Sequence, residues 1–141
     1  MELLKVFVDY AIFGILGLMS LLALTYAIER FFFYRGIVLE GYHNFDILET
    51  ELTRNLTALS IISSNAPYIG LLGTVMGIMI TFYDMGQSHH IDSNTILIGL
   101  SLALKATALG LVVAIPSLMA YSACLRKCDV LCAKWKSLYA A

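Results

Sequence analysis

Polar side chains inside apolar stretches give the first indication of chemistry in this 141-residue chain. Thr74 lies in one such stretch, and Lys105 and Thr107 lie close together in another. An ionisable residue at membrane depth is costly, so Lys105 is a candidate functional residue. Hydroxyl and ammonium groups in such a place can order water, support the passage of protons or contact a carboxylate of a partner.

The two threonine hydroxyls have two interpretations. Each can donate to the carbonyl four residues earlier in its own helix, which is common in membrane helices. If the helix faces that carry Thr74 and Thr107 line a shared lumen, the hydroxyls can instead order water beside a proton path. The residues and their spacing leave both interpretations open.

Lys105 also has two positions open to it. Ala106–Leu125 is itself an uncharged stretch of 20 residues, so the lysine could lie at the outer interface and extend its ammonium to water. Alternatively, a long tilted helix would place it in a wet interior or beside a carboxylate of a partner. A lysine at the outer edge runs against the tendency of basic residues to lie inside, which favours the interior position.

Two other groups of residues have spacings that occur in known sites. Ser101 and Lys105 lie four residues apart, as in a Ser–Lys hydrolytic dyad, but no nucleophile elbow, oxyanion loop or acidic partner accompanies them. His89, His90 and Asp92 could bind a divalent metal, although adjacent histidines in a polar loop are usually solvated. We therefore expect neither an enzyme nor a protein that carries a metal or another cofactor.

The three cysteines share one helix face. Cys124, Cys128 and Cys132 follow one another at intervals of four residues. A zinc site would need a fourth ligand and usually a tighter Cys-x-x-Cys pair. We interpret the cysteines as small, reduced, apolar residues on a cytoplasmic helix.

The composition indicates a membrane protein. Only 13% of the residues are charged and 60% are hydrophobic, whereas a soluble domain has about 25% charged residues. Scattered basic residues without an aromatic platform exclude a nucleic-acid-binding protein. We expect one all-α membrane domain over residues 1–141, with transmembrane helices at about 10–28, 67–83 and 96–121, a cytoplasmic connector at 36–64 and a cytoplasmic tail at 122–141.

The connector has the pattern of an amphipathic helix. Apolar residues recur at helical spacing from Phe45 to Ile62, and Asn44 is a suitable N-cap. We expect a break at Asn65–Pro67, with Pro67 in the first turn of the next helix. A polar loop is expected from 84 to 95.

Small residues on the last two spans predict close helix contacts in an oligomer. Glycine costs a helix about 1 kcal/mol in water, so glycines clustered within one span indicate that backbones meet there. The residues assigned to helix packing are Gly70, Gly73 and Gly77 on the second span and Gly110, Ala114 and Pro116 on the third.

The basic residues predict the orientation. The first connector and its flanks carry Arg30, Arg35 and Arg54, and the tail carries four more basic residues, whereas the loop 84–95 has no lysine or arginine. By the positive-inside rule, the connector and the C-terminus are cytoplasmic and the N-terminus lies outside.

Two motifs resemble those of a known family. The segments 66–82, APYIGLLGTVMGIMITF, and 99–121, GLSLALKATALGLVVAIPSLMAY, are similar to the ExbB/TolQ/MotA proton-channel family, most closely to its ExbB members. The similarity extends over about 56–121 and includes Glu29-Arg30 at the end of the first span.

The resemblance implies a multi-pass protein of the bacterial inner membrane with a periplasmic N-terminus. Its members form rings, pentamers in ExbB-like proteins, around the helices of an ExbD-like single-span partner whose intramembrane aspartate titrates. Proton flow would drive a TonB-like protein that energises nutrient uptake across the outer membrane. By motif, Thr74 and Thr107 match the pore-facing threonines of the family.

Two departures and three alternatives accompany the resemblance. Leu102 stands where ExbB and TolQ proteins often have a glutamate, and the connector is shorter than in typical members. The alternatives are a TolQ-like role in envelope maintenance, a flagellar stator, for which the short connector leaves little room, and a scaffold that conducts nothing.

Overall fold

The structure, a computed structural model, describes residues 2–89 and 91–139, and its regular elements there are all helices. In chain order they are α1 (Glu2–Gly36), the 3-10 helix η1 (Leu39–Gly41), α2 (Phe45–Leu52), α3 (Leu56–Ser88) and α4 (Ser93–Tyr139). The predicted all-α class is confirmed.

Three of these helices can cross a membrane. α1, α3 and α4 contain 35, 33 and 47 residues, and at about 1.5 Å per residue each exceeds the roughly 30 Å of a bilayer core. Each also has an 18-residue window of high hydropathy. The predicted spans lie within them, one in each helix.

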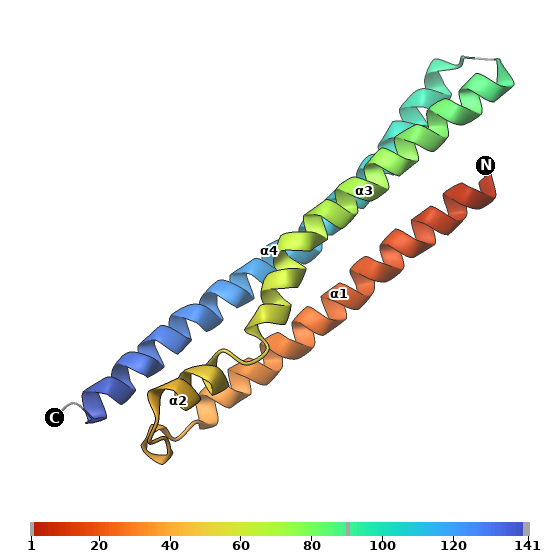
Figure 1. The fold of residues 1–141 in the computed structure, drawn as a ribbon. Coiled ribbons are helices and arrows are strands. Elements are labelled where there is room, and N and C mark those ends of the chain that lie inside the picture. Colours follow the sequence, from red (N-terminus) through yellow and green to blue (C-terminus); the bar gives the residue numbers. More distant parts are fainter. Residues whose placement is uncertain (1, 90, 140–141) are drawn as a thin grey trace.

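α3 and α4 form a long antiparallel hairpin, and α1 lies along it (Figure 1). The N-terminal end of α1 is on the side of the α3–α4 turn, whereas α2 and the end of α4 lie together at the opposite end (Figure 1). Large apolar side chains remain exposed along all three long helices, as expected of surfaces that face lipid or other subunits.

Two clusters of buried side chains hold the helices together. The first joins α2 to its neighbours and includes Leu48, Leu52 and Leu59, which are completely buried. The second joins α1, through Ile12 and Leu16, to α3 and α4. The short helix is therefore anchored by its leucines at one end of the hairpin.

The helix predicted for the connector is interrupted, so that prediction was wrong. We expected one helix from Phe45 to Ile62, but α2 ends after about two turns, and α3 begins only after a turn of three residues. Asn55 in the intervening turn has a φ of 67°, a left-handed conformation in which asparagine is enriched. The predicted N-cap is confirmed, because Asn44 Oδ1 accepts from the Asp46 N–H at 2.8 Å.

The break predicted at Asn65–Pro67 is absent, because α3 runs through Pro67. The Asn65 side-chain amide donates to the Ile61 carbonyl at 2.8 Å, and the Ser64 hydroxyl bonds the carbonyl four residues earlier. These polar groups therefore bond within the helix instead of ending it. Proline is tolerated inside membrane helices more often than inside helices in water.

The turn between α3 and α4 is shorter than predicted. Both helices extend into the segment Asp84–Thr95, which was expected to be a loop. Asp92 Oδ1 accepts from the Asn94 N–H at 3.2 Å, as an N-terminal cap does. At its other end α4 continues through the predicted tail as far as Tyr139.

Candidate functional site

The two predicted site threonines meet across the contact between α3 and α4. The Thr74 hydroxyl lies 2.9 Å from the Ala103 carbonyl on α4 and contacts the Thr107 hydroxyl. Each hydroxyl has a single proton and either one can be the donor between them, while the Gly70 carbonyl lies 3.3 Å from the Thr74 oxygen and 3.5 Å from the Thr107 oxygen. The pair therefore bonds across the helix interface, and the Thr74 hydroxyl also reaches the Gly70 carbonyl four residues earlier in its own helix, so both contacts considered for Thr74 are present.

The two hydroxyls differ in access. Thr74 is buried, with 6% of its surface exposed, whereas Thr107 is half-buried. Whichever hydroxyl donates to the other, the Thr107 oxygen keeps a lone pair that can accept from an outside donor. Thr107 is thus the member that can meet water or a partner, and Thr74 is a positioning residue that orients it.

Glycines allow the two backbones to approach at this point. A Cβ atom on Gly70 would lie 2.7 Å from the Ala106 carbonyl oxygen and 3.1 Å from Gly110 Cα. A Cβ atom on Gly110 would in turn lie 2.7 Å from the Ala66 carbonyl oxygen. Since these neighbours are backbone atoms that cannot turn aside, only glycine fits at both positions.

The close contact continues toward the α3–α4 turn. A Cβ atom on Gly73 would lie 2.8 Å from Ala106 Cβ, and one on Gly77 would lie 3.0 Å from Ala103 Cβ. Small residues thus face each other along the segment that contains the threonine pair. In lipid, such surfaces allow the van der Waals contact that holds membrane helices together.

Gly70→Ala should destabilise the protein, because the added methyl group must push α4 away. We expect a loss of about 1–3 kcal/mol in the free energy of unfolding, the usual cost of overpacking. The matched control on the same helix is Gly86→Ala, where an added Cβ meets nothing within 4 Å. Chemical unfolding in mild detergent measures both, and equal stability of the two variants would contradict this contact.

Lys105 is not brought to the threonine pair. Its side chain is exposed, and two residues of helix turn it about 200° away from Thr107. Leu102 and Leu109, one turn before and after it, are 50% and 36% exposed. Among residues 2–89 and 91–139, Lys105 has no hydrogen bond or ion pair, so its ammonium lies on an outward, apolar face of the chain.

The two remaining residues assigned to packing lie in different surroundings. Ala114 is buried in the cluster that joins α1 to α3 and α4. Pro116 is exposed and lines a groove between α1 and α4, together with Ser20 and Ala23. The structure therefore places Ala114, but not Pro116, among buried helix contacts.

The structure also shows where residues of the two other candidate sites lie, the Ser–Lys pair and the metal site. Ser101 is exposed on the same helix as Lys105, and Asp92 is used in the cap of α4. His90 lies outside the described residues. Within the described ranges, no three His, Cys, Asp or Glu side chains are grouped so as to hold a metal ion.

A buried arginine near the end of α1 has a structural role that the sequence did not predict. Arg30 is 1% exposed, and its guanidinium donates twice to the Glu29 carboxylate at 2.6 Å. A further N–H donates to the Glu51 carbonyl at 2.7 Å. That carbonyl belongs to the last turn of α2, where unpaired carbonyls and the helix dipole favour a cation. Arg30 therefore attaches α2 to α1.

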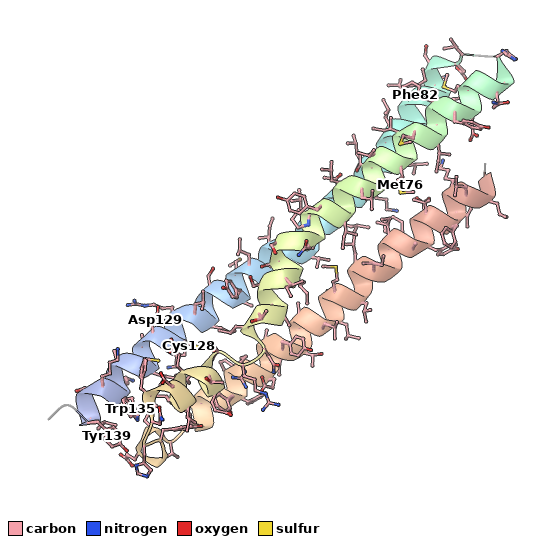
Figure 2. The ribbon with its side chains drawn as sticks, viewed as in Figure 1. Met76, Phe82, Cys128, Asp129, Trp135 and Tyr139 are labelled. Atoms are coloured by element: carbon pink, nitrogen blue, oxygen red, sulfur yellow. The ribbon has the colours of Figure 1, made fainter. Side chains whose placement is uncertain are left out.

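Two more side chains reach the same helix end. The Tyr34 hydroxyl donates to the Leu52 carbonyl at 2.6 Å, and Cys128 Sγ lies 3.1 Å from that oxygen. Figure 2 shows Cys128 on α4 beside α2. The signal available in the sequence was the Glu29-Arg30 pair directly after a long uncharged run, but the partners on α2 and α4 are distant in the chain.

Arg30→Met should loosen this junction by leaving the end of α2 without its cation. A hydrogen bond to a charged group contributes about 1.5–3 kcal/mol, and we expect the free energy of unfolding to fall by that amount. Arg54→Met removes an exposed arginine nearby and should change stability by less than about 0.5 kcal/mol. Urea unfolding of both variants in detergent tests this, and similar values for the two would show that Arg30 does not hold α2.

The end of α4 also holds the first connector. Trp135 Nε1 donates to the Tyr42 carbonyl and the Tyr139 hydroxyl donates to the Glu40 carbonyl, both at 2.9 Å. Trp135 and Tyr139 lie beside the segment around α2 in Figure 2. The end of α4 is thus packed against the connector as part of the fold.

Comparison with known proteins identifies the family. The model of the MotA/TolQ/ExbB proton channel family matches residues 28–137. The chain belongs to this family. The match spans α2, α3 and most of α4, and so includes the threonine pair and the Arg30 junction.

Two relatives of the MotA/TolQ/ExbB family cover nearly the whole chain. A biopolymer transport protein ExbB of Helicobacter pylori strain J99 is 57% identical over 136 residues, 96% of this chain and 94% of that protein. An ExbB of Aquifex aeolicus strain VF5 is 45% identical over 139 residues, 99% of this chain and 94% of that protein. Since both align over 94% of their length, neither has room for a much longer connector.

A TolQ protein is similar over a smaller part. The Tol-Pal system protein TolQ of Pseudomonas aeruginosa strain PAO1 is 40% identical over 74 residues, 52% of this chain and 32% of that protein. The predicted resemblance to the MotA/TolQ/ExbB family, with ExbB-named relatives over most of the chain, is confirmed.

Proposed function

We propose that this protein is the proton-channel subunit of an inner-membrane motor of the ExbB–ExbD–TonB type, rather than an enzyme. Several copies, five by analogy with ExbB-like proteins, would surround an ExbD-like single-span partner. Proton flow down the proton motive force would then drive a TonB-like protein and energise nutrient uptake across the outer membrane.

The threonine pair is the observation that carries this proposal. Thr107 keeps acceptor capacity at a half-buried position within a helix that can cross a membrane, and Thr74 fixes its orientation. A protonated carboxyl group or a water molecule is the donor that such an oxygen can accept from. An intramembrane aspartate on the partner would meet this requirement each time it becomes protonated.

The proposed orientation rests on the distribution of basic residues. The C-terminal ends of α1 and α4 lie with α2 at the same end of the molecule (Figure 1). Arg35 belongs to the last turn of α1, Arg54 follows α2 in the chain, and Lys134 and Lys136 lie near the end of α4. Basic residues gathered at one end of a membrane protein favour the cytoplasmic side for that end. The N-terminus and the α3–α4 turn would then be periplasmic, in the inner membrane of a bacterium.

A TolQ-like role in envelope maintenance is the second candidate, since the TolQ similarity covers about half of the chain. Removing the protein from cells separates the two. We expect receptor-dependent, energised nutrient uptake to fall to background and to return when the wild-type protein is restored. Intact uptake together with leakage of periplasmic proteins would overturn the ExbB-type role and favour the Tol-type role.

A further inference from the structure

A groove runs along the outside of the protomer between α1 and α4. Its wider part, about 550 Å³, is lined on α1 by Phe31 and Arg35 and on α4 by Ala123 and Lys127. A narrower part of about 250 Å³ continues toward the middle of both helices. Ala27 on α1 and Ala120 on α4 line both parts, so the two parts form one continuous groove.

The two ends of the groove differ in chemistry. Small and apolar residues line the end near Ser20 and Pro116, whereas Arg35 and Lys127 flank the other end. Both cations are exposed, and the Arg35 guanidinium lies 5.6 Å from the Phe31 ring centroid. No carboxylate in the described part of the chain forms an ion pair with either cation. An occupant with an apolar body and an anionic head would complement both ends.

The length of the groove fits one leaflet of a bilayer. From Ser20 to Arg35 the helix rises about 22 Å, at about 1.5 Å per residue. Half of a bilayer, including its headgroup region, is about 20–22 Å thick. With Arg35 at headgroup level, Ser20 lies near the bilayer midplane, which is also the centre of the span predicted at 10–28.

We propose that this groove binds an anionic glycerophospholipid, with one acyl chain along the alanines and the phosphate between Arg35 and Lys127. Basic residues next to a membrane span attract anionic lipids, and a pair that also flanks an apolar groove holds the headgroup and the chain together. The inference goes beyond the proposed function, because lipid binding does not require proton conduction. It uses the proposed orientation only to assign the lipid to the cytoplasmic leaflet.

Lipid titration of the purified full-length protein in mild detergent, followed by native mass spectrometry, tests the proposal. The probes are phosphatidylglycerol and phosphatidylcholine with identical acyl chains. We expect the wild type to bind phosphatidylglycerol about tenfold more tightly or better, and the variant Arg35→Gln/Lys127→Gln to lose this preference. The control Arg126→Gln/Lys134→Gln removes the same charge from exposed positions elsewhere on α4 and should keep the preference.

A second variant tests the apolar part of the groove. Ala123→Phe fills the space beside Lys127 and should weaken the binding of both lipids by a similar factor. Equal affinity of the wild type for the two lipids, or an equal loss of preference in the control, would overturn the proposal. Absence of bound lipid in the wild type, together with dissociation of the Ala123→Phe oligomer, would show that a second copy of the chain occupies the groove. Because Arg35 and Lys127 are exposed, the variant Arg35→Gln/Lys127→Gln should fold. It therefore tests the proposal even if Ala123→Phe does not fold.

Discussion

Thr107→Val is expected to reduce energised uptake by about tenfold or more. Valine keeps the shape of threonine, but it removes the one oxygen of the pair that can accept a hydrogen bond from water or from the carboxyl group of a partner. A lost hydrogen bond to a charged or strongly polar group costs about 1.5–3 kcal/mol, and 1.4 kcal/mol corresponds to a factor of ten. Uptake of a receptor-dependent nutrient, measured at equal expression, gives the result.

Two further variants distinguish the role of this oxygen from a structural role. Thr107→Ser keeps a hydroxyl and should retain most of the uptake. Thr81→Val removes a buried hydroxyl on α3 that donates only to the Gly77 carbonyl of its own helix, at 2.9 Å, and should leave uptake unchanged. Full uptake in Thr107→Val, or an equal loss in Thr81→Val, would show that the threonine pair serves only as a structural contact between α3 and α4.

Lys105→Met is expected to change uptake, or the affinity for the ExbD-like partner, by a factor comparable to that expected for Thr107→Val. An ammonium group on an outward apolar face is costly at membrane depth unless it is hydrated or paired. Because Lys105 points about 200° away from Thr107 on α4, in an assembled complex it would reach a carboxylate of another chain. Lys105→Arg keeps the charge and should be less affected, and Lys134→Met on the tail is the neutral control.

Reaction with an external amine reagent separates this role of Lys105 from that of an interfacial anchor. If the lysine contacts the partner, its labelling should fall when the ExbD-like subunit is present. High labelling in both states, together with normal uptake by Lys105→Met, would mean that the side chain merely extends to water at the outer interface.

The long helices could be predicted from the sequence because their signal is local. Long apolar stretches such as 10–28, which carries no charge, and 96–121, in which Lys105 is the single charged residue, are longer than a soluble core helix needs, and the structure has a helix in each. The ends of the helices were harder to predict. Asn65 and Pro67 are typical of helix breaks in water, but α3 runs through both, and the Asn65 side chain bonds a carbonyl of the same helix.

The candidate site was predictable by residue type and only partly by arrangement. Spacing put Thr74 and Thr107 on small faces of two helices, whereas their mutual contact depends on the register that Gly70 and Gly110 allow. The Arg30 junction could not be derived, because it joins residues 21 positions apart through a turn that the helical pattern did not reveal. Local periodicity describes faces, and tertiary register decides which faces meet.

Proton flux through the assembled complex tests the central claim most directly. The protein and its ExbD-like partner are reconstituted together into vesicles with a pH gradient and a potassium diffusion potential, and the internal pH is followed with a fluorescent dye. We predict proton entry above that of protein-free vesicles, lowered by Thr107→Val and unchanged by Thr81→Val. A stable complex of the two subunits that passes no more protons than empty vesicles, in the presence of the energy transducer as well, would contradict a proton channel and leave a scaffold.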